Sequence, residues 1–107
     1  MKIYAAQIPD DSMTLIKRIE GKDLWIRAIV PLDSQGYCDS WVKIVHVSPD
    51  GSLIRIQANP WNYRFGKYYD PDYTFYIGNY QLDIIYPVQL YTTEELIENL
   101  ELTTPGD

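Results

Sequence analysis

Apolar positions recur along the chain at two spacings, alternating in some segments and helical in others. Six short runs, rich in β-branched and aromatic side chains and bounded by Pro, Gly, Asn or Asp, predict strands. These runs are residues 2–8, 24–30, 41–47, 53–58, 73–77 and 81–86. In the fourth run the alternation is regular, so Ile54, Ile56 and Ala58 are expected to face the core. The intervening Arg55 and Gln57 are expected to face out.

Two turn signals predict which strands pair. Pro49-Asp50-Gly51 supplies Pro at the first central position of a turn and Gly where φ is positive. The third and fourth runs, on either side of it, are therefore expected to form an antiparallel hairpin. Gly78-Asn79 predicts a second hairpin, which pairs the fifth run with the sixth. Pro87 predicts that the sixth strand ends there or continues only along an edge.

A short helix is predicted between the first two strands. Leu15, Ile16 and Ile19 follow one another at helical spacing, and Gly21 stands just past the last of them. The candidates for its N-cap are Asp10, Asp11 and Ser12.

A second helix is predicted near the carboxyl end. Thr92 as N-cap and Glu95 three residues later form the pattern of a capping box. At 100° per residue, one arc of this helix is apolar and the opposite face is anionic. The apolar arc holds Leu96, Ile97 and Leu100, and the anionic face holds Glu94, Glu98 and Glu101. Such a face either is plainly solvated or presents charge to a basic partner.

These elements predict one α+β domain over residues 1–107, with a frayed tail at 103–107. The expected architecture is a bent antiparallel sheet or a small, partly open barrel of about six strands. A short helix follows strand one, and an amphipathic acidic helix closes the chain.

Charge is distributed unevenly along the chain. Fifteen acids and nine bases give a net charge of −6. All nine bases and nine of the acids lie in residues 1–80, so the whole net charge resides in residues 81–107. The acidic balance argues against direct binding to duplex nucleic acid or to an anionic membrane.

No leader or membrane-spanning run is evident, and the single cysteine, Cys38, cannot form an intramolecular disulfide. A cytoplasmic location is expected. We also expect no enzyme activity, cofactor or metal site. His46 is the only histidine, and we interpret it as a core or edge residue. Cys38 is placed in a polar loop, and Asp70 and Asp72 are read as turn residues.

Aromatic residues concentrate between Trp61 and Tyr80, where nine of the fifteen fall within twenty positions. An interior of this size cannot absorb them all, so some are expected at the surface. The candidates for a protein-binding surface are Trp61, Tyr63, Phe65, Tyr68 and Tyr69. The alternatives are simple packing, or stacking of a single-stranded nucleic acid or sugar-like ligand with Arg64 and Lys67 supplying charge.

The sequence therefore predicts a non-enzymatic binding or regulatory protein. It docks on a protein partner through the aromatic stretch, while Glu94, Glu98 and Glu101 steer it towards a basic surface. Such a partner is, for example, a nucleic-acid-processing protein that it would inhibit or regulate. The oligomeric state stays open, a dimer included.

Overall fold

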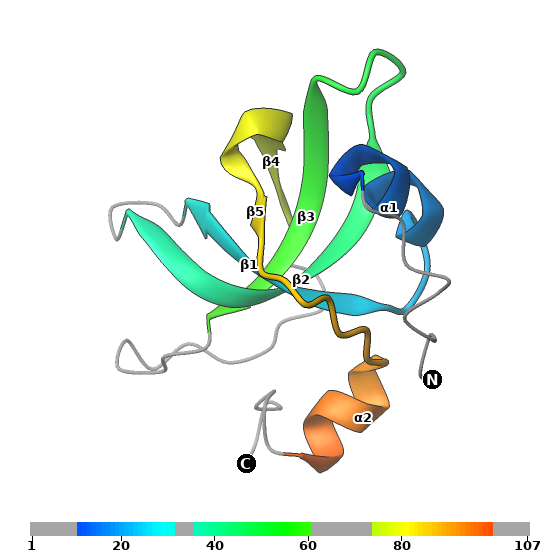
Figure 1. Cartoon of the computed structure of the whole chain (residues 1–107), viewed down its shortest axis with the longest axis vertical. Helices are drawn as coiled ribbons and strands as arrows, with labels where there is room; N and C mark the ends of the chain where they lie inside the picture. The colour runs from blue at the N-terminus through cyan, green and yellow to red at the C-terminus, as the bar shows by residue number, and fades with distance from the viewer. Residues whose placement is uncertain (1–10, 32–35, 61–73, 100–107) are drawn as a thin grey trace.

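The computed structural model describes residues 11–31, 36–60 and 74–99 of the chain (Figure 1). Its elements are α1 (Ser12–Ile19), β1 (Trp25–Pro31), β2 (Tyr37–Val47), β3 (Leu53–Pro60), β4 (Phe75–Gly78), the 3-10 helix η4 (Asn79–Gln81), β5 (Asp83–Ile84) and α2 (Thr93–Glu98). The strand predicted at residues 2–8 lies outside the described residues. The α+β class and the antiparallel sheet are confirmed.

The sheet is open, five-stranded and antiparallel, in the order β4-β3-β2-β1-β5. The longest strand, β2, is central and contains a bulge between Ile44 and His46. Figure 1 shows that this sheet is strongly curved. Curvature lets the short η4 segment connect the two outermost strands, β4 and β5, which a flat sheet would hold roughly 19 Å apart at its usual strand spacing.

The hairpin predicted between β2 and β3 is confirmed. Gly51 has a φ of 76°, which a residue with a Cβ adopts only with strain. The Asp50 carboxylate accepts hydrogen bonds from the Ser52 amide (3.0 Å) and from the hydroxyls of Ser48 (2.7 Å) and Ser52 (2.8 Å). These bonds stabilise the ionised carboxylate and lower the pKa of Asp50 to about 2, and the bond from the Ser52 amide has the largest effect.

The second predicted hairpin is wrong, because β5 pairs with β1 and not with β4. Gly78 has a φ of −71°, so it does not adopt the positive φ that a tight two-residue hairpin turn requires. Its amide instead donates to the Gln81 side chain (2.7 Å), and η4 follows. The Asn79 amide and side chain donate to the carbonyls of Ser52 (2.9 Å) and Gly51 (3.0 Å), which fixes η4 against the other hairpin.

Helix α1 forms as predicted. Asp11 is the N-cap, accepting from the Thr14 amide (2.9 Å) and hydroxyl (2.7 Å), and the hydroxyl bond is the leading cause of its lowered pKa. Gly21 follows the helix with a φ of 72°, and its amide donates to the Ile44 carbonyl. The apolar stripe of α1 is buried, and it consists of Leu15, Ile16 and Ile19.

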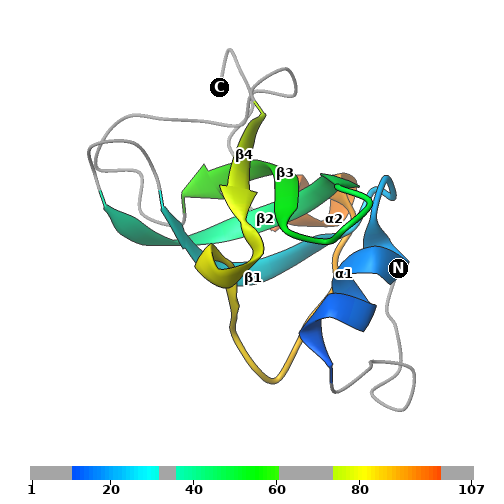
Figure 2. The same cartoon turned by 90° about the horizontal axis from the view of Figure 1, so that it is seen from above.

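Apolar residues form two clusters on the sheet. The main core is formed by α1, by alternate residues of the strands and by the segment after β5. Figure 2 shows that this segment lies on the same side of the sheet as α1. The smaller cluster consists of Trp25, Trp41 and Leu96, with Tyr91 and Ile97 packed against it. The two helices therefore lie against different parts of the sheet (Figures 1 and 2).

One expectation for β3 is wrong. Ile54 and Ile56 face the main core, as predicted, and Arg55 and Gln57 lie on the opposite face. Gln57 is nevertheless buried, at the position where it pairs with Lys43 of β2. Alternation of apolar and polar residues assigns side chains to the two faces of a strand, but it does not show that the polar face is exposed to solvent.

Helix α2 begins with the predicted capping box. Thr92 accepts from the Glu95 amide (3.1 Å), and the Glu95 carboxylate accepts from the Thr92 amide (2.9 Å). The amphipathic acidic helix expected through Leu100 and Glu101 extends beyond the described residues and stays a prediction. Within the described ranges, neither helix is long and apolar enough to cross a membrane.

Candidate functional site

Several predicted site residues lie outside the described residues. They are the aromatic candidates Trp61, Tyr63, Phe65, Tyr68 and Tyr69, the alternative ligand residues Arg64 and Lys67, and Glu101. Asp70 and Asp72 lie outside them as well. The structure does describe Glu94 and Glu98, both exposed on α2.

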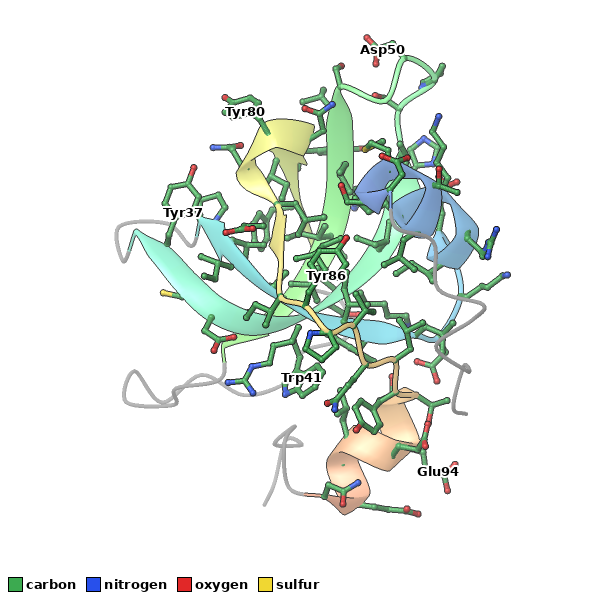
Figure 3. All side chains as sticks on the ribbon, viewed as in Figure 1. Tyr37, Trp41, Asp50, Tyr80, Tyr86 and Glu94 are labelled. Atoms are coloured by element: carbon green, nitrogen blue, oxygen red, sulfur yellow. The ribbon has the colours of Figure 1, made fainter. Side chains whose placement is uncertain are left out.

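Exposed tyrosines are a feature of the described surface. Tyr76 and Tyr80, which belong to the aromatic-rich stretch, are 56% and 85% exposed, and Tyr37 and Tyr86 are also more than half exposed. Figure 3 shows Tyr37 and Tyr80 projecting from the side of the sheet remote from Glu94. These two rings and the acidic residues of α2 therefore belong to separate surfaces.

Most described carboxylates serve the fold. Asp11 and Asp50 accept hydrogen bonds in a helix cap and a turn. Three others contact basic side chains. These pairs are Arg27 with Asp39 (2.8 Å), Lys43 with Asp23 (3.5 Å) and the His46 Nδ1 with Glu20 (3.1 Å).

Glu94, Glu98 and Asp83 differ from those carboxylates. All three are exposed, and within the part of the chain that the structure describes none forms an ion pair. Figure 3 shows Glu94 projecting from α2 away from the sheet. Helix α2 has no basic residue in its last turn to offset this charge. Among the described carboxylates, those that stay exposed and take part in no helix cap, turn or ion pair thus lie on α2 and β5.

A hydrogen-bond relay attaches α2 to the sheet. The buried Trp25 indole N–H donates to the Thr93 hydroxyl (2.7 Å), which in turn donates to the Asp23 carboxylate. The Thr93 amide also points to Asp23, and Lys43 approaches it from β2. Desolvation raises the pKa of Asp23, but the bonds from Thr93 and the charge of Lys43 outweigh it and hold the pKa below its usual value.

Trp41 lies between the sheet and α2 (Figure 3), and its surroundings differ from those of Trp25. The Tyr91 ring packs edge-on against it with centroids 5.7 Å apart, and the Arg27 guanidinium lies 5.9 Å from its ring centroid. Arg27 is held there by two hydrogen bonds to Asp39 (3.0 and 2.8 Å). The Trp41 indole N–H, on a side chain only 5% exposed, has no hydrogen-bond partner among the residues that the structure describes.

This contrast predicts different costs for the same substitution. Trp25→Phe removes a hydrogen bond and leaves the Thr93 hydroxyl with one donor fewer, whereas Trp41→Phe removes a buried donor that has no acceptor in the described part of the chain. We expect Trp25→Phe to lower the free energy of unfolding by about 1–2 kcal/mol more than Trp41→Phe does, since an unsatisfied buried donor is itself costly. Urea unfolding of both variants checks this. Equal costs would show that the Trp41 N–H finds an acceptor in solution.

The sequence did not single out this face of the sheet. Trp25 and Arg27 occupy alternate positions of β1, and Trp41 and Lys43 occupy alternate positions of β2. That parity was a usable signal for a second, half-polar face. This alternation could not predict that α2 covers the second face, because α2 lies about seventy residues further along the chain than β1.

Two further expectations change. Cys38 does not lie in a loop but in β2, opposite Val30, where it packs against the main core as a small apolar residue. His46 is an exposed residue of β2, not a core residue, because the adjacent bulge shifts the register at that point. Across the described ranges, His, Cys, Asp and Glu form no group of three that could hold a metal ion.

Comparison of the chain with protein-family models, with curated proteins and with solved structures finds no match.

Proposed function

We propose that this protein is a non-enzymatic binding module that docks on a protein partner with a basic surface. The exposed carboxylates of α2 steer the encounter, and the rings of the aromatic stretch, Trp61, Tyr63, Phe65, Tyr68 and Tyr69, supply the packed contact. A nucleic-acid-processing protein that it inhibits or regulates is the kind of partner that fits.

The observation that carries this proposal is the sorting of the charges. The Arg27, Lys43 and His46 side chains each contact a carboxylate, whereas Glu94 and Glu98 stay exposed and without an ion pair among the described residues. Like charges on one short helix repel one another and lower its stability. A basic surface brought against α2 would relieve that repulsion.

The same sorting weighs against single-stranded nucleic acid as the ligand. Such binders combine stacking rings with a clearly positive groove. On the sheet face that holds Trp41, the cations Arg27 and Lys43 are already matched by Asp39 and Asp23. The stacking function that Arg64 and Lys67 would serve stays a prediction. A titration of tryptophan fluorescence with an oligothymidine at low salt tests it, and saturable quenching would favour it.

Removing one carboxylate of α2 should slow association with the partner. After a partner has been captured from a host-cell lysate and purified, we expect Glu98→Gln to lower the association rate constant by about threefold at low ionic strength. The dissociation rate should change little, since an exposed charge at the rim of an interface acts mainly on the encounter. Biolayer interferometry at several salt concentrations measures both constants.

Thr14→Lys is the matched control, because it changes the net charge by the same single unit on the exposed face of α1, remote from α2 (Figure 1). The Thr14 amide can still donate to Asp11 in this variant. An association rate that falls equally in both variants, or in neither, would contradict steering by α2.

A further inference from the structure

A second surface has the opposite electrostatic character. It is defined here as the Arg55 patch and consists of Leu53, Arg55, Tyr76 and His46. Register places His46 of β2, Arg55 of β3 and Tyr76 of β4 side by side, and Leu53 lies two positions before Arg55. All four side chains are exposed, on the sheet face opposite the main core.

The Arg55 side chain is held in one orientation. Its Nε donates to the Thr74 hydroxyl (2.8 Å), and its guanidinium carbon lies 5.6 Å from the centroid of the Tyr76 ring. These two contacts leave the two terminal nitrogens of the guanidinium available. Side by side, they form a fork of N–H donors that can bind both oxygens of one carboxylate. Because the group is oriented in advance, less entropy is lost when that fork binds a planar anion.

Arg55 also differs from the other basic side chains on this face. Arg27, Lys43 and His46 each contact a carboxylate. Among the described residues Arg55 has no ion pair, although the chain carries fifteen acids and nine bases. An exposed, oriented Arg stacked on a tyrosine has the composition of a binding hot spot, and its charge selects the partner.

We propose that the Arg55 patch binds an extended segment of a protein partner through a carboxylate side chain of that segment. Two parallel N–H···O bonds from Arg55 to the carboxylate would fix the segment, and Tyr76 and Leu53 would pack against its neighbouring side chains. Tyr76 belongs to β4, the outermost strand of the described sheet on that side. A segment lying along β4 would place alternate side chains over this face.

Charge favours a protein segment with a carboxylate over a nucleic acid strand or a second copy of this chain as the ligand of the Arg55 patch. A nucleic acid strand offers many phosphates in a row, and the chain's net charge of −6 repels it while the patch supplies only Arg55 and the paired His46. A second copy of this chain brings the same net charge and the same Arg55. A partner segment with a single carboxylate among apolar residues matches both the cation and its surroundings. The patch is distinct from α2, so this proposal is independent of the partner proposed above.

The test uses a phage-displayed library of random 12-residue peptides, selected on the immobilised full chain. We expect the enriched peptides to share an Asp or Glu at a fixed position between apolar residues. Fluorescence anisotropy with the synthetic peptide should show about tenfold or greater loss of affinity for Arg55→Gln, because both bonds to an ionised acceptor are lost. Arg55→Lys should also lose affinity, since an ammonium lacks the fork. Lys17→Gln, an exposed charge change on α1, is the control and should bind as the parent does.

The peptide side of the pair gives a readout that needs no protein variant. Replacing the shared Glu by Gln should weaken binding as much as Arg55→Gln does, and the two changes together should cost no more than one. The proposal is overturned if no peptide is enriched, or if enriched peptides lack the acid. It is also overturned if Arg55→Gln keeps the affinity, or if sedimentation shows a dimer that Arg55→Gln dissociates, which would assign the patch to a second copy.

Discussion

Replacing Trp25 by Ala should lower the free energy of unfolding by about 3–5 kcal/mol, the usual cost of truncating a buried tryptophan. Trp25 is wholly buried, and its ring joins β1 to α2 through Leu96 and the Thr93 hydroxyl. Its backbone also pairs with Tyr91, in both directions, at 2.7 and 3.2 Å. The substitution thus leaves a cavity and removes the donor that begins the relay to Asp23.

The measurement is chemical unfolding followed by circular dichroism, with the midpoint and the slope both reported. A domain of this size has roughly 5–15 kcal/mol of stability in total, so Trp25→Ala should leave little of the folded state at 37 °C if the parent is near the lower value. Tyr80→Ala is the control, because its ring is 85% exposed and should change the stability by less than about 0.5 kcal/mol. A cost for Trp25→Ala below about 1 kcal/mol would mean that this part of the sheet face can collapse around the gap.

Leu96→Ala should cost about 2–5 kcal/mol, with its effect concentrated on the docking of α2. Leu96 is the buried residue of this six-residue helix, and it belongs to the same buried cluster as Trp25 and Trp41. Isolated helices of this length do not persist in water, so α2 depends on that contact. Its loss should expose both indoles to solvent.

Tryptophan emission should therefore shift to longer wavelength in Leu96→Ala, and the amide hydrogens of α2 should exchange faster than those of β2. Ile97→Ala provides the comparison, since Ile97 is only partly buried against the same cluster and should cost less. If the two substitutions had equal effects, or if exchange rose as much in β2 as in α2, Leu96 would not be the residue that docks the helix.

Much of the local structure could be predicted because its causes lie within a few residues. Asp11 caps α1 through an amide three positions away, and the apolar stripe of α1 follows the helical period. Gly51 closes the β2–β3 turn because glycine tolerates its positive φ. The exposure of Glu94 and Glu98 was likewise predictable from their opposition to Leu96 on α2.

Long-range pairing was not predictable in the same way. The Gly78-Asn79 signal is compatible with a hairpin, yet β5 gains more by pairing with β1, where Ile84 enters the main core. The sequence predicted a loop around Cys38, but pairing with β1 extends β2 to Tyr37. The Trp25–Thr93 contact joins residues 68 positions apart, and no local pattern encodes it.

Local sequence patterns were enough to predict the α+β class, α1, the β2–β3 hairpin and the capping box of α2, and composition gives the excess of acid in the last quarter of the chain. These structural elements depend on backbone preferences and side-chain spacing that act over a few neighbouring residues. Three features become visible only in the folded molecule: both faces of the sheet are partly covered, Arg27 and Lys43 are matched by carboxylates, and Arg55 is oriented by Tyr76. Those features arise when strands distant in sequence come into register, and the free energy of that pairing comes from burial shared across the whole sheet.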